Sequence, residues 1–277
     1  MLSRLIRHEW KETWRIPVVS FLIILILTLV CFFLFRQMEP PADPSAINVG
    51  AFVTMMLYCM AVSIISTVLI LYIAVRFYRN LYTDEGYLMH TLPVTPGQLL
   101  LSKLLVGALW MFVMSLLAFW AICCILLFGL PAMVNVDMTL LGPAVMELFP
   151  MLFGMKPIPF LLFYVLLSLI SSFSSVLTAY AAISLGQLFA KHKVMASILC
   201  YIGFTMLIQI VTSILMIPSL TRLILSEAML EATDTIPAVF GAYMREVFFI
   251  SMAGSLICAV VSYLLSGYIM KKQLNLD

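Results

Sequence analysis

The chain has 277 residues, of which 64% are hydrophobic and 10% are charged, and its mean hydropathy is +1.14. A soluble domain carries about 25% charged residues, so this composition excludes a water-soluble globule and indicates a membrane protein. The formal net charge is only +2 and no basic cluster is longer than a pair, so we expect no nucleic-acid partner.

Residues 1–15 are predicted to form an amphipathic helix. Basic residues take one face, and apolar residues recur every fourth position on another, at Leu2, Ile6, Trp10 and Trp14. Such a helix lies in the membrane–water interface, and we predict Trp10, Trp14 and Arg15 as its interfacial anchors. The helix either only anchors the first span or also contacts a partner protein.

Six long uncharged runs follow, and each is long enough for one spanning helix, which needs about 20 apolar residues. The sequence therefore predicts an all-α polytopic membrane protein with a single transmembrane domain over 1–277. The predicted spans are 16–35, 49–75, 104–130, 158–188, 194–217 and 247–270.

Lysine and arginine are distributed unevenly between the two sides of the membrane. Eleven of the 15 lie in 1–15, 76–103, 191–193 and 271–272, which share one side when six spans alternate in direction. The positive-inside rule assigns this side to the cytoplasm, so both termini are predicted to be cytoplasmic.

Two further features concern packing and the outer side. Small residues of the fourth span, from Ser168 to Gly186, share one helix face, and we interpret them as a helix-packing surface rather than a substrate path. Between the last two spans, Pro237 and Gly241 interrupt an apolar segment. For 218–246 we therefore expect an extracellular segment of short helices or a re-entrant turn.

No Asp, Glu, Lys or Arg lies inside the six uncharged runs, and His8, His90 and His192 also fall outside them. Ionisable residues within the membrane mark proton relays and ion sites, so their absence argues against a proton-driven carrier and an intramembrane protease. The six cysteines have no zinc-site spacing, and the P-loop pattern is absent. We expect no catalytic residue, metal or cofactor in this chain.

The segment 76–103 is the longest cytoplasmic loop. Its first part, 80–89, is compatible with a short helix that ends before Pro93. Thr95, Pro96 and Gln98 then form a helix-start pattern, with Thr95 as N-cap, Pro96 at the first helical position and Gln98 completing a capping box. Such a loop is either a coupling element or an ordinary interfacial hairpin.

The stretch FYRNLYTDEGYLMHTLPVTPGQLLLSKLL (77–105) resembles the cytoplasmic loop of permease subunits of bacterial ABC transporters of the ABC-2 exporter class. LIRHEWKETWR (5–15) is similar to their N-terminal interfacial helix. The resemblance implies a bacterial cytoplasmic membrane protein that pairs with a second permease copy or homologue. It also implies that P-loop ATPase subunits, which bind ATP and Mg, dock on a coupling helix formed by Thr83, Asp84, Glu85, Tyr87, Leu88 and Met89.

The resemblance implies export, or extraction from the membrane, of a peptide, an antibiotic or a lipid-like compound. Two alternatives remain open at this point. One is an antimicrobial-peptide sensing or immunity protein that does not transport. The other is a membrane-embedded transferase, for which the sequence offers no candidate residues.

Overall fold

The computed structural model describes residues 2–38, 49–82, 96–129, 138–189, 192–229 and 236–272. These residues form eight α-helices and one π-helical turn, and six of the helices are long and apolar enough to cross a membrane. The predicted all-α, six-span fold is therefore confirmed. The six helices are α2 (Arg15–Gln37), α3 (Val49–Tyr82), α5 (Pro96–Cys124), α8 (Pro157–Gly186), α9 (Lys193–Met229) and α10 (Ile236–Lys272).

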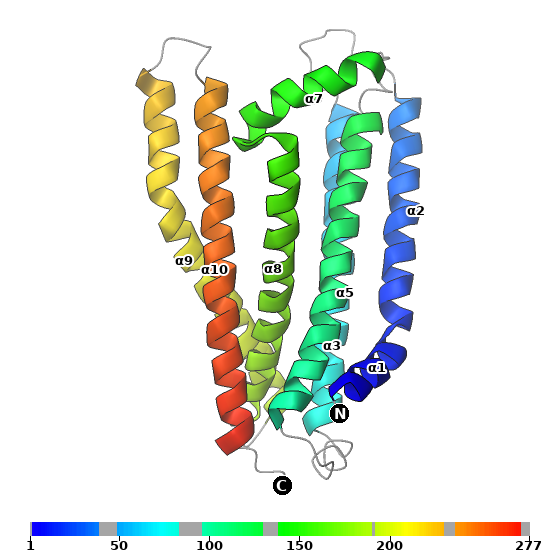
Figure 1. Cartoon of the computed structure of the whole chain (residues 1–277), viewed down its shortest axis with the longest axis vertical. Coiled ribbons are helices and arrows are strands. Elements are labelled where there is room, and N and C mark those ends of the chain that lie inside the picture. The colour runs from blue at the N-terminus through cyan, green and yellow to red at the C-terminus, as the bar shows by residue number, and fades with distance from the viewer. Residues whose placement is uncertain are drawn as a thin grey trace.

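The long helices run alternately in opposite directions (Figure 1). Helix α1 (Leu2–Thr13) lies at one end of the bundle together with the last turn of α10, and α7 (Met138–Phe153) lies across the other end. We call these the α1 end and the α7 end. The π-helical turn η1 (Ile125–Gly129) extends α5 at the α7 end.

The chain bends sharply at Trp14, although α1 ends at the residue before it and α2 begins at the residue after it. Pro17 stands in the first turn of α2 and has no backbone N–H, so the carbonyl of Thr13 cannot receive the usual helical hydrogen bond. This missing bond lets α1 lie at an angle to the bundle while α2 spans it.

Helix boundaries differ from the predictions chiefly at the polar ends of the spans. Helix α3 continues beyond residue 75 to Tyr82, and α5 begins at Pro96, the residue predicted for the first helical position. The segment 218–246 contributes to the ends of two long helices, because α9 continues through Pro218 to Met229 and α10 starts at Ile236. Helix α7, which the sequence analysis did not predict, forms from an apolar stretch that contains Pro143 and Pro150.

Helix α8 is the centre of the bundle. It contacts α3, α5, α9 and α10, and it is the most buried of the six candidate spans, whereas α9 and α10 are the least buried. Its small-residue face is buried at Ser168, Ser172, Ala179, Ala182 and Gly186, as the packing interpretation predicted. Small side chains let neighbouring backbones approach closely, which is the main source of helix association in lipid.

Candidate functional site

The predicted coupling residues cannot be placed, because Thr83, Asp84, Glu85, Tyr87, Leu88 and Met89 lie outside the described residues. Their role stays a prediction. What the structure does describe is the frame around them: α3 ends at Tyr82 and α5 begins at Pro96, both at the α1 end. The segment 83–95 therefore connects two spans at the end of the bundle where α1 lies.

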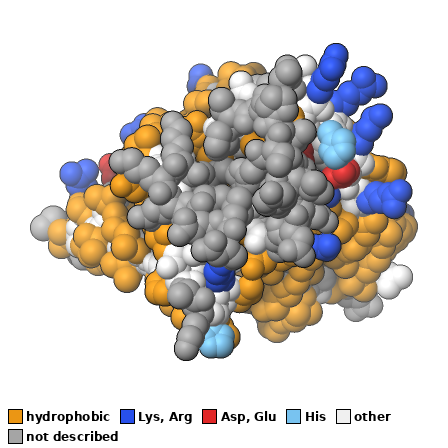
Figure 2. Space-filling model, turned by 90° about the horizontal axis from the view of Figure 1, so that it is seen from below, with side chains coloured by type: hydrophobic (Ala, Val, Ile, Leu, Met, Phe, Trp, Pro, Cys, Tyr) orange, Lys and Arg blue, Asp and Glu red, His pale blue; other side chains and the backbone are white. Residues whose placement is uncertain are grey.

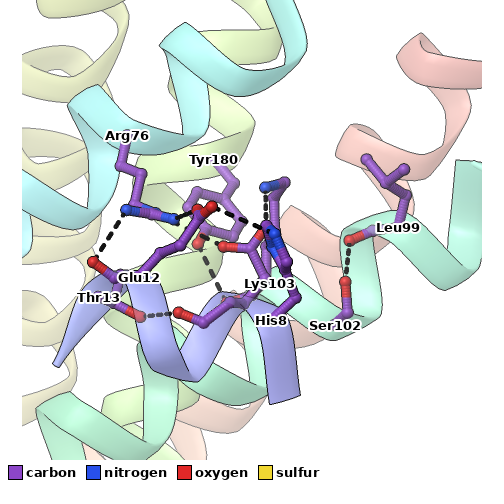
Figure 3. Close-up of polar contacts among 9 residues, drawn as sticks. His8, Glu12, Thr13, Arg76, Leu99, Ser102, Lys103 and Tyr180 are labelled. Carbon is purple, nitrogen blue, oxygen red and sulfur yellow. Dashed lines mark hydrogen bonds and ion pairs between the residues drawn. The ribbon is translucent and has the colours of Figure 1, made fainter. Parts of the chain in front are cut away.

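A buried ion cluster joins α1 to these same two spans. The carboxylate of Glu9 on α1 accepts a hydrogen bond from the ammonium of Lys103 on α5, and both side chains are less than 10% exposed. The other carboxylate oxygen of Glu9 lies 3.5 Å from Nε of Arg76 on α3. Arg76 also donates to the carboxylate of Glu12, one turn further along α1 (Figure 3).

Neighbouring polar contacts hold the α1 side of the cluster. Nε2 of His8 lies 3.3 Å from a carboxylate oxygen of Glu12, and the hydroxyl of Thr13 donates to the backbone carbonyl of Glu9. The Thr13 side chain is buried, so α1 presents both Glu9 and Thr13 to the bundle.

Helix α8 closes the cluster from above. The hydroxyl of Tyr180 donates to the backbone carbonyl of Lys103 at 3.3 Å (Figure 3). The ring of Tyr180 stacks on Phe77 of α3. Tyr180, Phe77 and Lys103 are all buried. Four helices, α1, α3, α5 and α8, therefore meet at one point.

The cluster is balanced in charge, with two carboxylates facing two cations. A buried charge is strongly unfavourable unless an opposite charge and hydrogen bonds compensate it. Glu9 therefore cannot leave Lys103 and Arg76 without a loss of charge compensation in a buried site. The consequence is mechanical: the ends of α3 and α5 are tied to each other through α1.

This site was not predicted from the sequence, because the basic residues of 76–103 served only to assign the sides of the membrane and Glu9 was given no role. Two signals were present. Glu9 falls three residues after Ile6 and four before Thr13, which places it on the face of α1 that packs on the bundle. Lys103 is the single charge in a leucine-rich helix start.

The predicted interfacial anchors occupy different environments. Trp10 stacks on Trp110 of α5 with ring centroids 4.2 Å apart, so it attaches α1 to the bundle as well as facing outward. Trp14 is 46% exposed, and Arg15 is also exposed at the start of α2. Their role as membrane anchors stays a prediction.

No group of three or more His, Cys, Asp or Glu residues able to hold a metal ion occurs within the described ranges. A comparison of the sequence with protein-family models found no match, and a search of curated proteins found no relative.

Proposed function

We propose that this chain is the permease subunit of an ATP-driven exporter of the ABC-2 class. It would act in a bacterial cytoplasmic membrane, with a second permease copy or homologue beside it and P-loop ATPase subunits beneath the α1 end. Its substrate would be a peptide, an antibiotic or a lipid-like compound. The resemblance of 77–105 and 5–15 to such permeases supports this proposal.

The distribution of charge supports an α1 end that faces the cytoplasm. Several lysine and arginine side chains gather at one edge of the face seen from this end, as Figure 2 shows. Arg4, Arg7 and Lys11 belong to α1, which lies at this end. The α7 end has fewer basic residues, with Arg36, Lys156, Arg222 and Arg245 in the described helices or next to them. This asymmetry follows the positive-inside rule.

The ion cluster around Glu9 is the observation that carries the proposal. An ATPase that pushes on the 83–95 segment would act on the ends of α3 and α5 together, because Arg76 and Lys103 both bind the same carboxylate. Helix α1 would move with them, and the stack of Phe77 on Tyr180 would pass the displacement to α8. A local push would thus become a movement of the bundle.

The chemistry of the spans supports an external source of energy. The six spans predicted from the sequence contain no ionisable Asp, Glu, Lys, Arg or His side chain that could couple transport to a proton or ion gradient. In this proposal ATP and Mg bind the partner ATPase. This chain contributes the substrate path and the helices that move when the ATPase pushes on them.

The test uses the full-length chain expressed with a P-loop ATPase encoded in an adjacent reading frame. Leu88→Asp and Glu85→Arg are expected to reduce co-purification of the ATPase and to abolish substrate-stimulated ATP hydrolysis. Glu147→Arg is the matched control, because Glu147 is an exposed acidic residue on α7 at the opposite end.

Survival of both the association and the stimulated hydrolysis after both changes would contradict the proposal. Binding of an antimicrobial peptide by the isolated chain, with protection of cells that lack any cognate ATPase, would instead support the immunity function.

A further inference from the structure

A lateral cavity lies between α3 and α9, with α8 as its floor. Both α3 and α9 pack on α8, and small side chains at Ala74, Ala179 and Ala182 leave a cavity of about 240 Å³. Leu71 of α3 and Ile198 of α9 line the cavity and are exposed on the outer surface of the bundle. The cavity therefore opens sideways, toward the lipid around the spans.

The lining of this cavity favours hydrocarbon over water. It consists of aliphatic and small side chains, with Tyr78, Tyr201 and Ser197 as the residues that carry a hydroxyl. The hydroxyl of Ser197 already donates to the backbone carbonyl of Lys193 at 2.9 Å. A water molecule needs several polar partners to stay in a cavity, so this lining favours a hydrocarbon occupant.

Positive charge stands at the α1 end of the same cavity, on both walls. On α3, Leu71, Val75 and Arg79 follow each other at four-residue spacing, which places Arg79 about 6 Å beyond the lining residue Val75 along the helix axis. On α9, Lys193 directly precedes the lining residue Val194. Helix α9 also begins at Lys193, so the positive end of its dipole adds to the charge there.

The length of the cavity fits one leaflet of a bilayer. Its lining on α9 extends from Val194 to Tyr201, which corresponds to about 11 Å along a helix. Half of a bilayer's hydrocarbon core is about 15 Å thick. From the α1 end inward, positive charge therefore comes first and the apolar cavity follows. This order matches an anionic lipid head with an attached acyl chain.

We propose that this cavity is a binding site for one anionic phospholipid of the surrounding bilayer. An acyl chain lies between α3 and α9 against Ala179 and Ala182, and the phosphate lies between Arg79 and Lys193. Basic residues between the ends of spanning helices are a known means of holding anionic lipid heads. The site does not depend on the proposed transport function, because it is defined by the spans and the charge at their ends.

Native mass spectrometry of the purified full-length chain tests the site. Phosphatidylglycerol and phosphatidylcholine with identical acyl chains are added separately to the detergent-solubilised protein. We expect one phosphatidylglycerol to bind with at least tenfold higher affinity than phosphatidylcholine. Lys193→Glu should weaken phosphatidylglycerol binding at least fivefold and leave phosphatidylcholine binding unchanged.

Ala74→Phe tests the cavity itself and should weaken binding of both lipids, because the phenyl ring occupies the acyl-chain position. Lys193 and Ala74 are only partly buried, so both variants should fold, which their thermal unfolding midpoints check. Lys156→Glu, a charge reversal at the start of α8, and Leu207→Phe, on an exposed part of α9, are the matched controls.

Equal affinity for the two lipids in the unaltered chain would overturn the proposal. So would unchanged phosphatidylglycerol binding in both folded test variants. An equal loss of phosphatidylglycerol binding in Lys156→Glu and Lys193→Glu would also overturn it, because it would show that general surface charge is responsible.

Discussion

The ring of Tyr180 on α8 lies parallel to the ring of Phe77 on α3, with 3.7 Å between the ring centroids and 11° between the planes. The Tyr180 hydroxyl reaches a third helix, since it donates to the Lys103 carbonyl on α5. Both rings are almost completely buried. This pair therefore packs three spans together directly beside the charges that attach α1.

Replacing Tyr180 separates the contribution of its ring from that of its hydroxyl. Tyr180→Ala should destabilise the protein by about 3–5 kcal/mol, because it removes a buried aromatic ring and leaves a cavity. Tyr180→Phe keeps the stack and should cost about 1 kcal/mol or less, the usual value for one hydrogen bond between membrane helices. Thermal unfolding in detergent measures the stability of both variants. A loss for Tyr180→Phe above this expected value would show that the hydroxyl, rather than the ring, holds the helices together.

Glu9 and Glu12 form a matched pair of carboxylates on α1 that differ in burial. Glu9→Gln leaves the buried Lys103 ammonium without its carboxylate from α1 and should destabilise the protein by about 3–5 kcal/mol. Glu12 is 44% exposed, and Glu12→Gln should cost less than about 1 kcal/mol. The unfolding midpoints of the two variants, measured side by side, check this order.

Lys103→Met provides a second comparison in the same cluster. It leaves Glu9 next to Arg76, which lies 3.5 Å away, so we expect a smaller loss than for Glu9→Gln. Equal stability of Glu9→Gln, Lys103→Met and the unaltered chain would contradict a structural role for the cluster.

Two glycines at the α7 end bring α7 and α10 into backbone contact. Gly154 follows α7 with φ +65°, a conformation that favours glycine, and a side chain there would clash with the carbonyl of Gly241 on α10. A Cβ on Gly241 would in turn lie 2.8 Å from the carbonyl oxygen of Pro150. Gly154→Ala and Gly241→Ala should therefore separate α7 from α10 and lower the yield of folded protein.

Gly142 in α7 is the control for these substitutions, because a Cβ there meets no atom within 4 Å. Gly142→Ala should be neutral or stabilise the helix by up to about 1 kcal/mol. Size-exclusion profiles and unfolding midpoints distinguish the two groups. Normal behaviour of Gly154→Ala would show that α7 does not pack against α10 as described.

The crossing of α8 and α9 depends on Gly186. A Cβ at this position would clash with the hydroxyl of Ser197 and would lie 2.6 Å from its backbone Cα. Gly186→Ala should therefore destabilise the bundle, and adding Ser197→Gly should not restore stability, because the backbone is also in the way. Gly203→Ala on α9 has open space and serves as the control; full rescue by Ser197→Gly would contradict the close crossing.

The sequence predicted the elements whose cause is local. A run of apolar residues long enough to cross the bilayer must be helical, because every backbone group has to be hydrogen-bonded within the chain. The start of α5 at Pro96 also has a local cause, so it could be predicted from the residues around it. The ends of α9 and α10 were less predictable, because helices can continue past the bilayer wherever neighbours support them, as α10 does at Gly241.

The sequence by itself determined six helices long and apolar enough to cross a membrane, a basic side and an amphipathic first helix, because hydrophobicity and charge act on each segment separately. Only the tertiary structure decided that Glu9 meets Lys103 and Arg76, and that Ala74, Ala179 and Ala182 surround a common cavity. Contacts of this kind depend on which helices become neighbours and at what depth. In lipid that choice is made by close packing of small residues, which leaves little trace in the hydrophobicity of any single helix.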